Sequence, residues 1–149
     1  MMKPREFLVV FARLAVGGVL VYAGFLKAAG PVAEFAAILE AYKLFPSAAL
    51  TPLALGLPYV EMWVGLFVLS GLYTRYAALI AAILSTAFLS AVGSALARGL
   101  DLASCGCFGP DTLKPQHTLA IDVVLLALSL VIVKLGKLPP PLSLDRTLS

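Results

Sequence analysis

The sequence predicts an all-α polytopic membrane protein: one domain of residues 1–149 in which a bundle of four transmembrane helices carries an amphipathic helix on its outer side. Of its 149 residues, 61% are hydrophobic and 13% are charged, against about 45–50% and about 25% in ordinary soluble domains. The mean hydropathy is +1.00, which indicates more apolar surface than one core of this size can bury. Four long apolar segments provide the natural explanation, because each is long enough to cross a lipid bilayer.

The apolar segments cover about residues 7–26, 51–72, 76–96 and 119–135. The first has about 20 residues, which gives about 30 Å of helix and spans a hydrocarbon core. So few residues separate the second and third segments that these two must form an antiparallel hairpin. Small residues at i+4 spacing in the third segment predict the face that packs against neighbouring helices: Ala78, Ala82, Thr86, Ser90 and Ser94.

Residues 31–45, between the first two spans, predict an amphipathic helix. Its apolar side chains fall on one face at helical spacing: Phe35, Ile38, Leu39 and Tyr42. We expect this helix to lie at the outer membrane interface, with an ordinary extracellular connector as the alternative.

The placement of Lys and Arg predicts the orientation in the membrane. With the N-terminus inside, the cytoplasmic side holds Lys3, Arg5, Arg75, Lys134, Lys137 and Arg146, and the outer side holds Lys27, Lys43, Arg98 and Lys114. We therefore expect an inner-membrane protein with both termini in the cytoplasm and the loop of residues 98–118 outside. The net charge of +3 includes no basic run, which argues against a nucleic-acid partner.

Apart from Lys134 at the cytoplasmic end of the last span, three charged residues lie within the predicted spans, where charges are costly and normally face a partner. Arg13 lies early in the first span and Glu61 near the middle of the second, and their depths predict an ion pair between them. Asp122 lies near the outer end of the last span, with Lys27 and Arg98 as candidate partners. Such pairs either only fix the helix register or form a layer of polar residues beneath the outer loop.

The outer loop contains Cys105-Gly106-Cys107. Two cysteines this close can form a disulfide only with a distorted backbone, which glycine permits, and a strained, exposed disulfide exchanges readily. The rival is a thiolate site for a soft ion such as Cu(I) or Hg(II), although an extracytoplasmic loop favours oxidised cysteines. His117 is a weak further metal ligand; it could also steady a thiolate or donate to a quinone oxygen, or simply be a solvated or capping residue. We assign no metal.

The chain resembles the MauE/DoxX family of redox-associated membrane proteins, and specifically its MauE-like branch. The resemblance covers nearly the whole chain and rests on residues 22–27, 58–61, 71–75 and 105–109, together with Arg13, Tyr42, Pro46 and Asp122. The string Cys-Gly-Cys-Phe-Gly is its most specific part.

This resemblance implies a four-helix bundle similar to vitamin K epoxide reductase and DsbB, with Cys105 and Cys107 as the thiol pair and Glu61 and Asp122 as matching polar positions. The methylamine-utilisation member is linked to disulfide formation in a periplasmic dehydrogenase subunit, alongside a thioredoxin-like partner. DsbB-like enzymes use two cysteine pairs and this chain has one, so electrons must pass onward to a second protein or to a membrane quinone near Tyr59, Trp63 or Phe88.

The expected function is thiol–disulfide exchange with an extracytoplasmic thioredoxin-like protein, with the direction of electron flow open. The alternative from another class is a non-enzymatic membrane subunit that binds or transfers soft metal ions, or that scaffolds a redox complex.

Overall fold

A computed structural model describes residues 3–100, 106 and 114–136. These residues contain no strand and form five helices: α1 (Pro4–Ala29), α2 (Val32–Ala41), α3 (Ser47–Ser70), α4 (Thr74–Ala97) and α5 (Pro115–Leu135). Four of them, α1, α3, α4 and α5, are long and apolar enough to cross a membrane. The predicted fold class is thus confirmed, and the chain is a multi-pass membrane protein.

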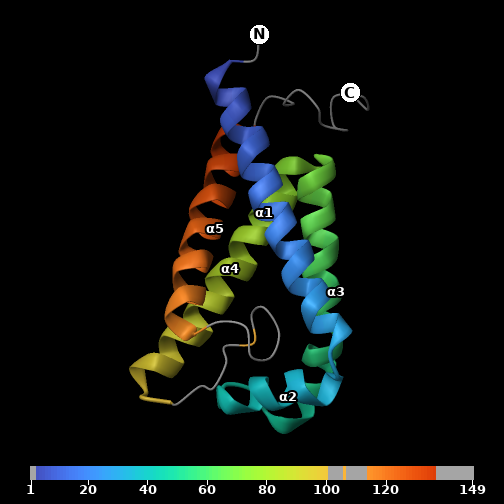
Figure 1. Ribbon diagram of the computed structural model, residues 1–149, viewed down its shortest axis with the longest axis vertical. Coiled ribbons are helices and arrows are strands. Elements are labelled where there is room, and N and C mark those ends of the chain that lie inside the picture. The colour runs from blue at the N-terminus through green and yellow to red at the C-terminus, as the bar shows by residue number, and fades with distance from the viewer. Residues whose placement is uncertain (1–2, 101–105, 107–113, 137–149) are drawn as a thin grey trace.

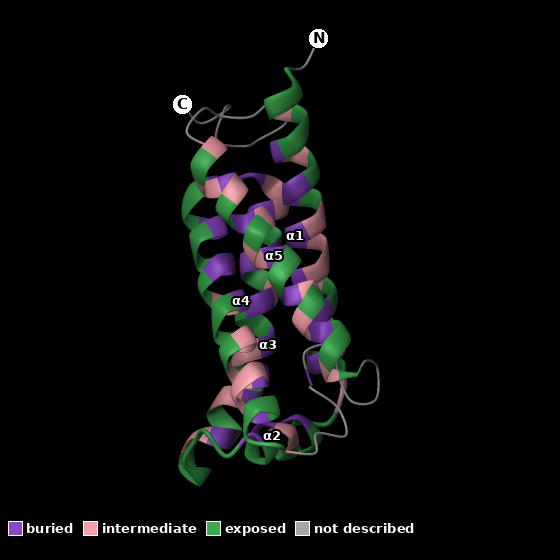
Figure 2. Cartoon of the chain, turned by 90° about the vertical axis from the view of Figure 1, so that its left-hand side faces the viewer, coloured by how far each residue is buried: buried purple, intermediate pink, exposed green. Residues whose placement is uncertain are grey.

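The four long helices close into a bundle in which α1 packs against α3 and α5, and α4 packs against α5 and α3. The start of α1 and the end of α5 lie at one end of this bundle, whereas α2 lies across the opposite end (Figure 1). Buried positions face the other helices and exposed positions face outward (Figure 2). The outward faces carry large apolar side chains such as Phe7, Phe11 and Trp63, as expected of a surface that meets lipid.

The long helices extend beyond the predicted apolar segments. Pro4 and Pro115 occupy the first turns of α1 and α5, where a missing N–H group leaves no helical hydrogen bond unmade. α3 ends at Gly71, whose φ of 70° is left-handed, and Tyr73 (φ 48°) leads directly into α4. This short connection forms the predicted antiparallel hairpin.

The helices α1 and α3 approach each other through glycine. A Cβ on Gly17 would lie 2.7 Å from the carbonyl oxygen of Gly65, and a Cβ on Gly24 would lie 2.6 Å from that of Pro58. Without side chains at these points the two backbones pack closely, as small residues allow between membrane helices. Gly17 and Gly24 lie seven residues apart, and so do their partners in α3, so these contacts fix the register of two antiparallel helices.

The apolar face of α2 packs onto the bundle. Phe35 and Leu39 are buried in a cluster with Leu50 and Ala54 of α3, and Tyr42, at the C-terminal end of α2, is also buried. The predicted amphipathic helix is therefore present, and its apolar side packs against α3.

The predicted packing face of α4 is correct only in its first half. Ala78 and Ala82 are buried, but Thr86 and Ser90 are exposed, and their hydroxyls donate to carbonyls of their own helix, those of Ala82 and Thr86. An i+4 stripe advances about 40° per step around a helix with 3.6 residues per turn, so it leaves the buried face. The buried face instead recurs every three or four residues: Thr74, Ala77, Ala78, Ala81, Ala82, Ser85, Val92 and Ala95.

Candidate functional site

The residue between the two cysteines is packed beneath α2. Cys105 and Cys107 themselves lie outside the described residues, but Gly106 is buried and has a φ of 68°. A Cβ on this residue would lie 2.5 Å from Cγ2 of Ile38. Both the left-handed backbone and the close contact with α2 therefore require glycine here.

An apolar cavity of about 220 Å³ lies between α2, α3 and α4. Gly106 forms part of its wall, and the other lining residues are almost all aliphatic or aromatic: Phe35, Leu39, Tyr42, Phe45, Leu53, Leu57, Leu84, Ala87, Phe88 and Ala91. A cavity of this kind suits an apolar ring more than a charged ligand.

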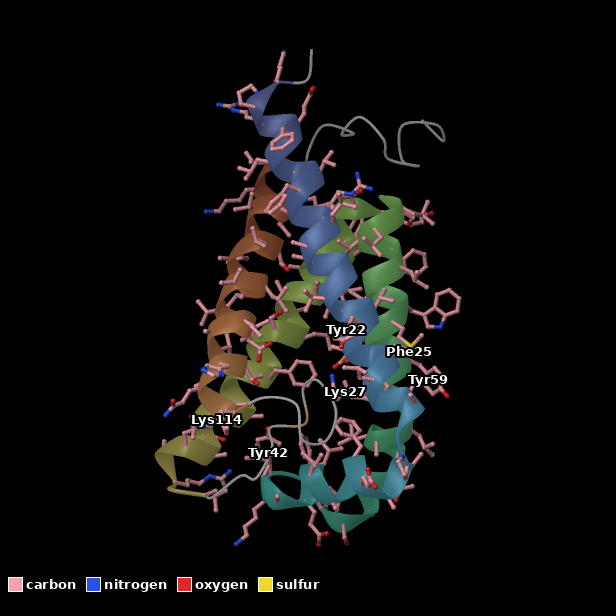
Figure 3. All side chains as sticks on the ribbon, in the orientation of Figure 1. Tyr22, Phe25, Lys27, Tyr42, Tyr59 and Lys114 are labelled. Atoms are coloured by element: carbon pink, nitrogen blue, oxygen red, sulfur yellow. The ribbon has the colours of Figure 1, made fainter. Side chains whose placement is uncertain are left out.

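A buried ion pair lies behind one wall of this cavity. Nζ of Lys27 in α1 is 2.6 Å from Oε2 of Glu61 in α3, and the two side chains are 1% and 0% exposed. Lys27 extends into the interior of the bundle (Figure 3). Its Nζ also lies 5.1 Å from the ring centroid of Phe88 and 6.0 Å from that of Phe35, so two rings that line the cavity contact this cation through their π systems.

The glycine contacts between α1 and α3 explain how Lys27 reaches Glu61. In their register Lys27 lies opposite Leu55, and Glu61 is six residues farther along α3, or about 9 Å. Side chains lean toward the N-terminus of their own helix, so in an antiparallel pair Lys27 and Glu61 lean toward each other. The two charged groups therefore meet although their backbones are offset by about 9 Å along the helices.

Asp122 of α5 belongs to the same buried polar group. Together with Lys27, Glu61 and Ser85 of α4, it lines a small internal space of about 10 Å³. All four of these side chains are buried, so each long helix contributes one polar residue. Lys27, a predicted candidate partner of Asp122, thus lines the same space as Asp122, whereas the ion pair of Lys27 is with Glu61.

The predicted pairing of Arg13 with Glu61 is wrong. Nε and Nη2 of Arg13 donate to the carbonyl oxygens of Val68 and Leu69, at 3.0 and 2.9 Å. Arg13 leans toward the start of α1, away from Glu61, and binds the end of α3, where the helix leaves carbonyls without helical donors.

Arg98 does not serve as the partner of Asp122. Its Nη2 donates to the carbonyl oxygen of Tyr42 at 2.6 Å, and its Nε donates to the carbonyl of Ser94 in its own helix. Arg98 thus ties the end of α4 to the end of α2.

The remaining predicted residues lie at the surface. Tyr59 and Trp63 are 56% and 62% exposed, and Tyr59 lies on the outer side of α3 (Figure 3). Neither lines the cavity, whereas Phe88, also predicted near a quinone, does. His117 is exposed in the first turn of α5.

Two features of the site are not apparent from the sequence pattern. Ser85 is a polar residue of the interior, and Gly17, Gly24 and Gly65 set the register of α1 and α3. The seven-residue spacing of Gly17 and Gly24 on one face of an apolar helix could have indicated the close approach. Within the described part of the chain, no group of three His, Cys, Asp or Glu side chains could hold a metal ion.

Comparison with known proteins identifies the family. A search of curated proteins and a search of solved structures each gave no match. The family model described as "Methylamine utilisation protein MauE" matches residues 5–135, which include all four spanning helices, the cysteine pair and the buried charged residues. The chain therefore belongs to the MauE family of membrane proteins.

Proposed function

We propose that this protein is an integral membrane thiol–disulfide redox protein that exchanges disulfides through Cys105 and Cys107 with an extracytoplasmic thioredoxin-like protein. It passes the electrons to or from a membrane quinone held in the cavity between α2, α3 and α4. The observation that carries the proposal is the position of Gly106, which is bonded to both cysteines and forms part of the cavity wall.

The sequence links the cysteines to the cavity wall. Gly106 lines the cavity and is joined to Cys105 and Cys107 by peptide bonds. A planar, apolar quinone ring matches the aliphatic and aromatic lining. The cation of Lys27 behind Phe88 and Phe35 gives that wall a positive potential, which favours negative charge as it develops on a reduced ring.

The cysteine pair and the quinone together account for the electrons and protons of the exchange. A thiolate of the partner protein attacks one sulfur of the Cys105–Cys107 disulfide and forms a mixed disulfide, and the released cysteine remains as a thiolate. The second thiol of the partner resolves the mixed disulfide, which leaves the pair reduced. The dithiol then closes to a disulfide as two electrons and two protons pass to the quinone, giving hydroquinone; the reverse sequence reduces the partner.

The same arrangement supports the proposed location and sidedness. The ends of α1 and α5 lie at one end of the bundle, and α2 lies at the other (Figure 1). Because the positive-inside rule assigns the first end to the cytoplasm, Gly106 and the cysteines face the extracytoplasmic side of the inner membrane. The family description names methylamine utilisation, and the resemblance stated above suggests a periplasmic dehydrogenase subunit as the first protein to test as the final recipient of disulfides.

The test is to trap covalent intermediates with single cysteine variants. Cys105→Ala and Cys107→Ala each leave one thiol, and we expect at least one of them to hold a thioredoxin-like protein as a mixed disulfide that a reductant releases. A thioredoxin-fold protein encoded beside this gene is the first candidate. If neither variant forms a mixed disulfide, and thiol labelling shows a permanently reduced pair in the native membrane, the proposal is wrong. Stoichiometric, cysteine-dependent retention of Cu(I) would instead favour a metal-binding subunit.

A further inference from the structure

Two carboxyl groups and one ammonium group share a small space in the interior of the bundle. Lys27 supplies the ammonium group, and Glu61 and Asp122 supply the carboxyl groups. All three are buried and line one small space. The other helix at this space, α4, contributes the neutral residues Ser85 and Phe88. An ionised carboxylate inside a membrane protein is costly, whereas a carboxyl group that binds a proton is neutral.

Glu61 has an oxygen that is available to bind that proton. Oε2 accepts from Lys27, but Oε1 is buried and has no hydrogen-bond partner among the described residues. A buried acceptor without a donor costs free energy. The space of about 10 Å³ that Glu61 lines is roughly the size of one water molecule, too small for a larger ligand. The chemistry of this site therefore suits a proton, alone or carried by one water.

One aromatic side chain separates this group from the apolar cavity. Phe88 lines both the cavity and the small polar space, and its ring centroid lies 5.1 Å from Nζ of Lys27. Phe35, whose ring centroid lies 6.0 Å from the same Nζ, also lines the cavity. The buried charges are thus a single ring away from any molecule in the cavity.

We propose that Lys27, Glu61 and Asp122 form a proton-exchange site within the membrane that serves the cavity. This role rests on the proposed function, because quinone chemistry supplies the need for protons. Reduction of a quinone takes up two electrons and two protons, and closure of a dithiol to a disulfide releases two of each. The site takes up a proton released at the thiols and gives one up to a quinone oxygen, so it returns to its starting state after each cycle.

The first test observes the proton directly. Infrared spectroscopy of the purified protein in lipid, in H₂O and D₂O, detects protonated carboxyl groups by their C=O stretch. We expect a deuterium-sensitive band for a protonated carboxyl in the apolar interior that titrates with pH and is lost or shifted in Glu61→Gln or Asp122→Asn. Glu40→Gln on exposed α2 is the matched control and should leave it unchanged. If no such band occurs at any pH, or if both interior variants keep the wild-type band, the site does not exchange protons.

The second test separates this role from the proposed function. The wild-type protein is given dithiothreitol and a short-chain quinone, and exchange at the cysteines and quinone reduction are followed separately. We expect Glu61→Gln to slow quinone reduction at least about a hundredfold, the scale of lost general acid–base assistance, and to alter its solvent isotope effect. Reaction of dithiothreitol with the cysteine disulfide should keep its wild-type rate, which also shows that the variant is folded.

The outcomes of this test are distinct. If the wild type shows no cysteine-dependent quinone reduction, the quinone half of the proposed function fails and the infrared result still decides whether the site binds a proton. If the wild type reduces quinone and a folded Glu61→Gln variant does so at the same rate with the same isotope effect, the proton-exchange role is overturned while the proposed function stands.

Discussion

Lys27 and Glu61 form an ion pair at 2.6 Å, although the register of α1 and α3 offsets their backbones by six residues, or about 9 Å. The pair closes because both side chains lean inward from antiparallel helices, and because glycine contacts hold those helices close together. This one relationship links the packing of α1 and α3 to the polar interior of the bundle. It also explains why the stability of the protein and its proposed chemistry depend on the same residues.

Removal of one partner of this ion pair should destabilise the protein strongly. Lys27→Met leaves Glu61 as a buried charge without its cation, a change that costs about 3–5 kcal/mol in buried pairs. The double variant Lys27→Met/Glu61→Met should recover much of that loss, because it removes both charges. The free energy of unfolding, measured by SDS titration in mixed micelles, checks both expectations. Lys134→Met, at an exposed position in α5, is the control and should be close to neutral.

The close approach of α1 and α3 predicts opposite effects for two similar glycine substitutions. Gly24→Ala places a Cβ 2.6 Å from the carbonyl oxygen of Pro58, and we expect this overpacking to cost about 1–3 kcal/mol. Gly18→Ala introduces the same methyl group where nothing lies within 4 Å, so it should be neutral or stabilise α1 by up to about 1 kcal/mol. Thermal unfolding in detergent distinguishes the two, and equal melting temperatures would mean that the helices do not meet at Gly24.

The contact of Gly106 with α2 predicts that Gly106→Ala lowers redox activity more than backbone strain alone would. Gly106 and Gly99 have nearly equal φ angles, 68° and 67°, but only Gly106 has a neighbour within 4 Å of its added Cβ, the side chain of Ile38. Both Gly→Ala variants therefore incur about 1–2 kcal/mol of left-handed strain. We expect thiol exchange to fall in Gly106→Ala and to stay near wild type in Gly99→Ala, as measured by the rate of maleimide labelling and mixed-disulfide formation.

Partial filling of the apolar cavity should weaken quinone binding. Ala91→Phe projects a ring into the space between α2, α3 and α4, and we expect the KM for a short-chain quinone to rise at least about tenfold, or about 1.4 kcal/mol. Trp63→Phe alters an exposed aromatic on α3 that does not line the cavity and should leave the KM unchanged. A larger effect at Trp63 than at Ala91 would instead place the quinone on the outward face of α3.

Much of the fold is readable from the sequence because hydropathy and turn signals are local properties. The four apolar segments predict the four spanning helices, since a stretch of about 20 apolar residues has few alternatives to crossing a bilayer. The short connection around Gly71 predicts the hairpin of α3 and α4, and the apolar face of residues 31–45 predicts α2. The Cys-Gly-Cys string and the accompanying motifs indicate the family.

The partners of the buried charges were not readable in the same way. Depth along each span predicted that Arg13 would meet Glu61, whereas Arg13 binds the carbonyls of Val68 and Leu69. Pairing depends on the register and rotation of two helices and on the direction in which long side chains lean, and these follow from glycine contacts between residues about 34 to 48 positions apart in the chain. The tertiary structure alone decided that Lys27 is the partner of Glu61.

The sequence by itself thus determined that this is a four-span membrane protein with a cysteine pair in the loop before its last helix. Only the tertiary structure decided that Gly106 lines an apolar cavity and that Lys27, Glu61 and Asp122 share one buried space behind Phe88. The physical reason is that membrane insertion depends on the summed hydrophobicity of each segment, whereas a site depends on which faces of different helices meet.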